Sequence, residues 1–141
     1  MTVPDSVADH RPAHRMTVVL VVEDEVLVRF ALADYLRESG LRVFEARCAE
    51  EAMQLISFYK GEIDVVFCDV WLPGAINGIE LAGWVKRHRA ELPVVLTSGD
   101  TRVAPDALRA APFLRKPYDL KAVLVLLEQT AHRPPPQPGV A

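Results

Sequence analysis

Six polar side chains stand at or just after the ends of short apolar runs, and their types suit one kind of chemistry. They comprise two adjacent acids, a third acid, two adjacent hydroxyls and a lysine, namely Glu23, Asp24, Asp69, Thr97, Ser98 and Lys116. Carboxylates that lie close together repel one another unless a cation comes between them, and hard oxygen ligands suit Mg²⁺. A carboxylate beside that cation, with an ammonium and a hydroxyl to hold anionic oxygens, can accept a phosphoryl group. These residue types therefore predict phosphoryl transfer to an aspartate, provided that the fold brings them together.

Asp69 is the residue on which this prediction depends. It ends the apolar run 63–68 and is followed by a bulky pair of residues and then by Pro73 and Gly74. The β-branched run predicts a buried strand, and the Pro-Gly pair predicts that the strand stops there. An aspartate in that place is either a structural cap of the next loop or a reactive group, and this stretch alone favours neither.

The elements that must position these side chains alternate along the chain. Apolar runs predict strands at about 17–22, 41–45, 63–68, 93–97 and 113–115. Apolar residues at helical spacing predict helices at about 26–39, 49–59, 78–89 and 118–131, with Asn77 as the N-cap of the third. This alternation predicts an α/β fold, a parallel sheet covered by helices on both sides. The carboxyl ends of its strands would then meet at one edge, where ligands bind.

The composition excludes several classes of protein. The chain has 141 residues, half of them hydrophobic, which fits one domain with its own core. A net charge of −3 disfavours a dedicated nucleic-acid binder, so we expect no DNA partner. Cys48 and Cys68 give neither a disulfide framework nor a metal spacing, and indicate free thiols in a reducing cytoplasm. No apolar run has the length of a membrane helix, so we expect no membrane partner.

Both ends of the chain, and one internal segment, depart from this regular pattern. Residues 1–16 show no period and predict a disordered tail, 17–131 form the folded domain, and 132–141 form a proline-rich tail. Between Pro105 and Pro112 fewer than two helical turns fit, so we expect the fourth helix to be shortened or disordered. We hypothesise that this segment is mobile and becomes ordered on phosphorylation or on partner binding.

Four motifs, in this order, resemble the receiver domain of bacterial response regulators, the proteins that accept phosphoryl groups in two-component signalling. The motifs are VLVVEDE (19–25), FCDVWLPG (67–74) followed by Asn77-Gly78, PVVLTSG (93–99) and FLRKP (113–117). The resemblance covers about 17–131. It implies a flavodoxin-like, doubly wound sheet of five parallel strands in the order 2-1-3-4-5.

The resemblance also implies roles for individual residues. Asp69 would be the phosphorylated aspartate, and Lys116 would contact the phosphoryl group. Glu23, Asp24 and Asp69 would hold Mg²⁺ together with the main-chain carbonyl of Trp71.

Two further positions would form the switch of the domain. The switch hydroxyl stands five residues after Pro93, which is Ser98 by that count, with Thr97 as its neighbour. The switch aromatic stands three residues before the lysine, which is Phe113. A phenylalanine lacks the hydroxyl of a tyrosine, so its switching would depend on packing.

Each assignment has a simpler structural alternative. Glu23 and Asp24 could stabilise a helix start, where acids are favoured. Lys116 could be an exposed loop lysine, and Phe113 could belong to the core. The joint occurrence of all these residues at the ends of different strands favours the functional interpretation.

The function that follows is a stand-alone receiver, not an enzyme, that takes a phosphoryl group from a sensor histidine kinase or a histidine phosphotransfer protein. It would then bind a downstream protein, relay the phosphoryl group or drain it. A Mg²⁺-dependent aspartyl-phosphate hydrolase is an alternative, although such enzymes usually carry an acid at the position of Trp71. A degenerate, non-phosphorylated interaction domain is another. We expect a cytoplasmic location, and the apolar last helix suits either core burial or weak pairing of two copies.

Overall fold

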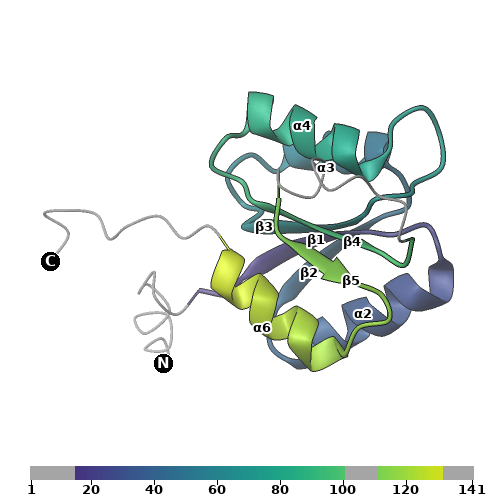
Figure 1. Ribbon diagram of the computed structural model, residues 1–141. Helices are drawn as coiled ribbons and strands as arrows, with labels where there is room; N and C mark the ends of the chain where they lie inside the picture. Colours follow the sequence, from purple (N-terminus) through teal and green to yellow (C-terminus); the bar gives the residue numbers. More distant parts are fainter. Residues whose placement is uncertain (1–14, 101–110, 132–141) are drawn as a thin grey trace, which may run out of the picture.

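The computed structural model describes residues 15–100 and 111–131 (Figure 1). The strands are β1 (Val18–Val22), β2 (Arg42–Ala46), β3 (Val65–Asp69), β4 (Val94–Ser98) and β5 (Phe113–Arg115). The helices are α2 (Val26–Glu38), α3 (Ala49–Phe58), α4 (Gly78–His88) and α6 (Leu120–Thr130). These elements match the expected order, with ends that differ by one or two residues. None of these helices is long and apolar enough to cross a membrane.

The five strands form one parallel sheet in the order β2-β1-β3-β4-β5, as the resemblance implied. Helices α3 and α4 cover one face, and α2 and α6 cover the other (Figure 1). The pairing of β3 with both β1 and β4 places its carboxyl end between two neighbouring strand ends. The doubly wound fold is therefore confirmed.

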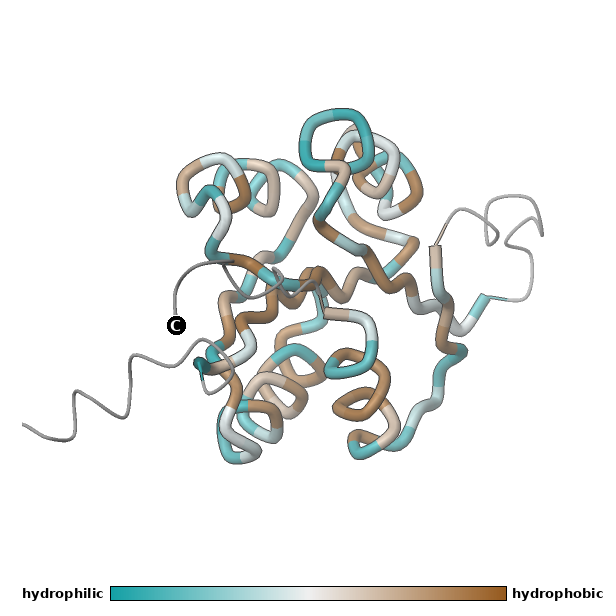
Figure 2. Tube along the Cα trace, turned by 90° about the vertical axis from the view of Figure 1, so that its left-hand side faces the viewer, coloured by the Kyte–Doolittle hydropathy of each residue, from teal (hydrophilic) through white to brown (hydrophobic). Residues whose placement is uncertain are grey.

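The strands are apolar on both faces because each face packs against helices. Figure 2 shows apolar strands running between helices that carry both apolar and polar residues. Alternate residues of β1 belong to different cores, with Leu20 on the side of α3 and α4 and Val19 on the side of α2 and α6. Burial of each such side chain contributes roughly 1.5–3 kcal/mol to the stability of the fold. The two cores therefore hold the strands, and the side chains at their carboxyl ends, in fixed positions.

The helix ends follow local sequence signals. Asn77 caps α4 as expected, through a capping box in which its side chain accepts from the Glu80 N–H and the Glu80 carboxylate accepts from the Asn77 N–H. Asp119 caps α6. Gly40, with a φ of 96°, closes α2 in the left-handed conformation that glycine adopts without strain.

Several expectations concern residues outside the described part of the chain. The short helix expected at 105–111 falls almost entirely within 101–110, and the tail 132–141 and most of the tail 1–16 are likewise not described. Of the N-terminal tail, Arg15 is described, and its guanidinium pairs with the buried Asp64.

Candidate functional site

The carboxyl edge of the sheet brings together the acids that follow β1 and the acid that ends β3. One carboxylate oxygen from each of Glu23, Asp24 and Asp69 lies within 4.8 Å of the other two. Glu23 is 3% exposed and Asp69 is 7% exposed, whereas Asp24 faces solvent. The predicted acidic cluster therefore exists, with one open side.

Lys116 reaches into this cluster from the end of β5. Its Nζ donates to Glu23 Oε1 at 2.9 Å and to Asp69 Oδ2 at 2.9 Å. Its main-chain N–H donates to the Ser98 carbonyl at 3.0 Å, which continues the pairing of β5 with β4. Lys116 is thus not an exposed loop lysine, and β4 fixes the backbone from which it extends.

The electrostatics of the cluster are unbalanced. Three carboxylates against one ammonium leave a surplus of two negative charges. Burial raises the pKa of Glu23 above its ordinary value, although the hydrogen bond from Lys116 opposes this change. Burial would lower the pKa of Lys116, but its hydrogen bonds to Glu23 and Asp69 prevail and raise that pKa well above its usual range. Lys116 is therefore charged at neutral pH and holds part of the excess charge.

The loop after β3 holds the Asp69 carboxylate through backbone contacts. The Trp71 N–H donates to Asp69 Oδ1 at 3.0 Å, and the Val70 N–H donates to the Thr97 carbonyl at 2.9 Å. The Gly78 N–H donates to the Val70 carbonyl at 2.7 Å. The Trp71 indole is 51% exposed and lies at the surface.

Gly78 lets the first turn of α4 approach Asp69 closely. A Cβ at this position would lie 2.2 Å from the Asp69 carbonyl oxygen and 2.8 Å from the Val70 Cα. No side chain fits there, so glycine is required by the close approach of the two backbones. The sequence motif Asn77-Gly78 therefore has two physical functions. Asn77 caps α4, and Gly78 allows the backbone of α4 to lie directly against the backbone of Asp69 and Val70.

The loop after β1 is held by hydrogen bonds from its main chain to buried groups of β2 and α2. The Glu23 N–H donates to the Ala46 carbonyl of β2 at 3.0 Å, and Arg29 Nη1 donates to the Glu23 carbonyl at 2.8 Å. Sequence reasoning missed Arg29. The signal was its helical spacing from Leu32 and Ala33, which places a cation on the buried face of α2.

The two hydroxyls at the end of β4 differ in their partners. Both Thr97 and Ser98 are 1% exposed. Ser98 Oγ accepts from the Asp100 N–H at 3.0 Å, whereas Thr97 Oγ1 has no hydrogen-bond partner among the described residues. Because neighbouring strand residues face opposite ways, only one of them can share a face with Phe113. Phe113 is half-buried and packs on the core under α3 and α4.

The acidic cluster fits a hard divalent cation. It offers carboxylate oxygens only, and Asp24 is open to solvent, so water can complete the coordination that Mg²⁺ prefers. The surplus of two negative charges equals the charge of such an ion. Glu23, Asp24 and Asp69 are the residues that would hold it.

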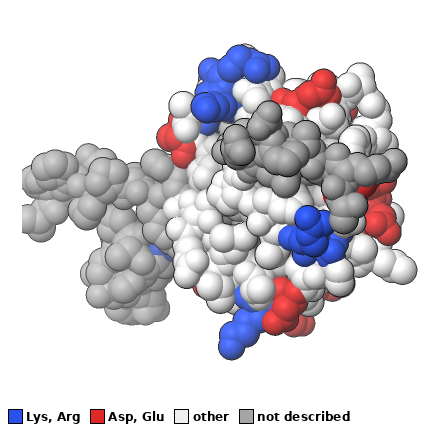
Figure 3. All heavy atoms as spheres, viewed as in Figure 1, with Lys and Arg blue, Asp and Glu red and all other residues white. Residues whose placement is uncertain are grey.

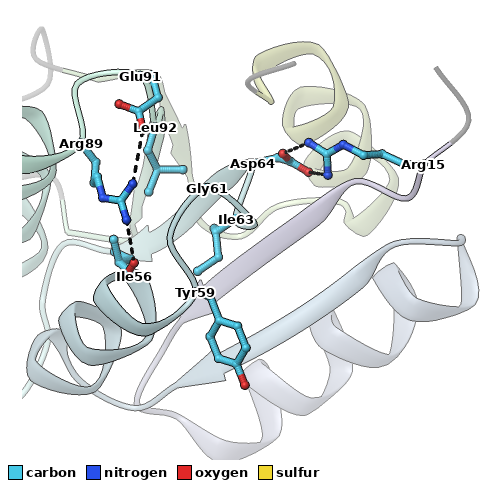
Figure 4. A pocket seen from close by; sticks show the side chains of 9 residues that line it. All are labelled: Arg15, Ile56, Tyr59, Gly61, Ile63, Asp64, Arg89, Glu91 and Leu92. Atoms are coloured by element: carbon cyan, nitrogen blue, oxygen red, sulfur yellow. Dashed lines mark hydrogen bonds and ion pairs between the residues drawn. The ribbon is translucent and has the colours of Figure 1, made fainter. Parts of the chain in front are cut away.

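The opposite, amino edge of the sheet has a cavity of about 190 Å³ but no such cluster among its lining residues (Figure 4). There Asp64 accepts from Arg15, while Arg89 donates to the Ile56 carbonyl and pairs with Glu91. Each of these charged groups is already paired. Basic side chains gather over one end of α4, where the last turn carries Lys86, Arg87 and His88 (Figure 3).

Known proteins share this sequence pattern and fold. A family model of the response regulator receiver domain matches residues 19–128. The chain is 34% identical to the transcriptional regulatory protein PdtaR of Mycobacterium tuberculosis over 137 residues, 94% of this chain and 64% of PdtaR. It is 32% identical to the nitrogen assimilation regulatory protein NtrX of Azorhizobium caulinodans over 116 residues, 79% of this chain and 25% of NtrX. It thus spans less than two thirds of either relative.

Among solved structures, the response regulator protein TrrA of Thermotoga maritima, in complex with Mg(2+)-BeF, is similar with a TM-score of 0.72. The identity is 27%, and the match covers 82% of this chain and 99% of TrrA. The similarity therefore extends over nearly all of the folded region.

Proposed function

The chain belongs to the response regulator receiver domain family, and on that premise we propose that Asp69 accepts a phosphoryl group from a phosphohistidine. The donor would be a sensor histidine kinase or a histidine phosphotransfer protein, the partners with which receiver domains interact. The observation that carries the proposal is the position of Lys116, whose ammonium bridges Glu23 and Asp69 inside the acidic cluster.

The chemistry follows from the contacts of Asp69. A carboxylate oxygen of Asp69 attacks phosphorus, the phosphorus–nitrogen bond breaks, and the electron pair of that bond leaves with the donor imidazole. Lys116 donates to Asp69 Oδ2 and the Trp71 N–H donates to Oδ1, so both oxygens are oriented before the reaction. The Lys116 ammonium then lies beside the new phosphoryl oxygens and neutralises part of their charge.

We propose that Mg²⁺ is required and is held by Glu23, Asp24, Asp69 and the Trp71 carbonyl. Bound there, the ion would supply positive charge to the phosphoryl oxygens. The charge surplus of the cluster supports this assignment, and so does TrrA, a related chain in complex with Mg(2+)-BeF.

Ser98 and Phe113 are proposed as the switch pair. Ser98 is buried at the end of β4, where its hydroxyl accepts from the Asp100 N–H and could donate its own proton to a phosphoryl oxygen. Phe113 lies on the neighbouring strand and is half-buried, so a change of its packing would reach the surface. Thr97 is the alternative to Ser98 as the switch hydroxyl, because its Oγ1 has no hydrogen-bond partner among the described residues.

The proposed output is a signal rather than turnover. Receiver domains are typically phospho-acceptor switches, and the position two residues after Asp69 is Trp71 rather than an acid. We propose that the domain acts alone, by binding a downstream protein or by relaying or draining the phosphoryl group. Because PdtaR is named a transcriptional regulator, the absence of a DNA partner stays a prediction.

The test is incubation with acetyl phosphate and Mg²⁺, followed by intact mass. The wild type should gain one phosphoryl group, Asp69→Asn should gain none, and Asp34→Asn, on the exposed side of α2, should behave like the wild type. Chelation of Mg²⁺ should abolish the gain. A wild-type mass that never changes would instead support the degenerate interaction domain.

A further inference from the structure

Arg29 is a buried cation beneath the loop that carries Glu23 and Asp24, and the proposed chemistry does not use it. It is only 7% exposed. Its Nη1 donates to the Glu23 carbonyl at 2.8 Å, and its Nε donates to Glu45 Oε1 on β2 at 3.1 Å. Its guanidinium also lies 5.3 Å from the centre of the Phe30 ring. A buried guanidinium with this many partners is held rigidly.

The carbonyl that Arg29 holds belongs to the peptide bond between Glu23 and Asp24. The N–H of Glu23 is fixed separately by the Ala46 carbonyl at 3.0 Å. Rotation of the Glu23–Asp24 peptide would change the direction of the Asp24 side chain relative to that of Glu23. The contact from Arg29 therefore restricts a backbone rotation that would separate these two carboxylates.

Besides Arg29, the Glu23 carboxylate also holds the start of α2, because Glu23 Oε2 accepts from the Glu25 N–H at 3.1 Å. The N-cap residue of α2, Glu25, makes no capping hydrogen bond from its own side chain. By contrast, Asn77 and Asp119 cap α4 and α6 with their own side chains. At α2 the loop and the helix are connected by the Glu23 carboxylate and by Arg29, which lies one turn into the helix and bonds to the main chain of the loop.

Glu45 anchors the other end of this contact without adding charge to the cluster. The Glu45 carboxylate accepts from Arg29 through Oε1 and pairs with Arg37 through Oε2 at 3.0 Å. Arg37 is 44% exposed and touches Glu45 and the Val43 carbonyl but not Glu23. The two arginines share one partner, and only Arg29 reaches the acidic loop.

We propose that Arg29 is a positioning residue for the divalent cation, because it fixes the Glu23–Asp24 peptide so that both carboxylates face Asp69. The proposal rests on the Mg²⁺ site of the proposed function. Arg29 donates to the main-chain carbonyl of Glu23 and to Glu45, and not to the carboxylates that would hold the ion. It acts through the backbone, as a residue of the outer shell that orients ligands.

The test is Mg²⁺ affinity, measured by calorimetric titration of the folded, unphosphorylated protein. Arg29→Met keeps most of the apolar stem and should weaken Mg²⁺ binding about ten-fold, the scale at which outer-shell partners act. Arg29→Lys retains one donor and should recover part of the affinity. Arg37→Met removes the other arginine from the same glutamate and should change the affinity less than about two-fold.

Circular dichroism and thermal unfolding check that each variant is folded at the titration temperature. If Arg29→Met does not fold, Glu45→Gln tests the same anchor and should weaken binding in the same direction. Equal affinities for the wild type and these variants, or equal losses for Arg29→Met and Arg37→Met, would overturn the inference alone. A wild type that takes up no Mg²⁺ would overturn the proposed metal site as well.

Discussion

The two edges of the sheet each bury a carboxylate against a cation, but they differ in charge balance. At the amino edge, Asp64 is 2% exposed and accepts from Arg15 and from the Val18 N–H, so one acid meets one arginine. At the carboxyl edge, Asp69 and Glu23 share the single ammonium of Lys116, and Asp24 adds a third acid.

This difference in charge balance separates a structural ion pair from the proposed binding site. At the amino edge the charges balance in pairs, since Asp64 pairs with Arg15 and Glu91 pairs with Arg89. The carboxyl edge keeps two negative charges in excess, which costs stability and attracts a cation. The cavity shown in Figure 4 lies at the balanced edge, so the proposed site is distinguished by its surplus of negative charge and not by a hollow shape.

The largest loss of stability should come from substitution of Gly78, because the resulting clash lies at the carboxyl edge alone. The Cβ of Gly78→Ala would meet the Asp69 carbonyl oxygen at 2.2 Å, so either α4 or the Asp69 loop must move. We expect a loss of about 3 kcal/mol in the free energy of unfolding, by urea denaturation, and slower phosphorylation by acetyl phosphate.

Gly83 in the same helix provides the control. A Cβ there would meet only the flexible end of Arg87, at 3.4 Å. Gly83→Ala should therefore gain roughly 0.5–1 kcal/mol from helix propensity, with phosphorylation unchanged. If both variants lost similar amounts of stability and phosphorylation, the close approach of α4 to Asp69 would not be the reason that glycine is needed at position 78.

The next effect sharpens the comparison, because one conservative change should act in opposite directions at the two edges. Asp64→Asn removes a charged partner of Arg15 and of the Val18 N–H and should cost about 1.5 kcal/mol, since Arg15 is partly exposed. Asp69→Asn removes one of three crowded negative charges and should stabilise the Mg²⁺-free protein by up to about 1 kcal/mol.

Both variants are measured by urea denaturation in the presence of a chelator. Addition of Mg²⁺ should then stabilise the wild type and Asp64→Asn but not Asp69→Asn. Destabilisation by both changes would show that Asp69 supports the fold in the same way as Asp64.

The smallest effect is a dependence on pH that originates in Glu23. Because burial raises its pKa above 4.5, the folded protein binds more protons than the unfolded chain between 4.5 and that higher value. The free energy of unfolding should therefore fall as the pH rises through this window, relative to Glu23→Gln. Urea denaturation of both proteins at several pH values measures the slope. A rise in relative stability over the same window would contradict the assignment.

The sequence was sufficient for the order of the elements and for most of the site. Apolar runs with acids at their ends predicted the strands that carry Glu23 and Asp69, because buried parallel strands are apolar on both faces. The motif around Lys116 placed an ammonium at the same edge. These predictions succeeded because each polar side chain directly follows an apolar run in the sequence, so the end of the strand and the position of the side chain are predicted together.

Other features could not be predicted because they depend on packing between distant segments. Nothing local shows that Arg29 turns inward to the Glu23 carbonyl, or that Arg15 in the expected tail meets Asp64. Gly78 is recognisable as a helix start, but its contact with the Asp69 backbone appears only when α4 is docked. The choice between Ser98 and Thr97 depends on which face of β4 each hydroxyl occupies.

The bridge made by Lys116 has a consequence for how the chain matures. It joins residues that lie 93 and 47 positions apart, and such distant contacts close late because the intervening chain must first be ordered. During synthesis Asp69 emerges well before Lys116, so an unfinished chain carries the proposed acceptor without its ammonium. Phosphorylation that depends on Lys116 therefore requires that β5 has already paired with β4.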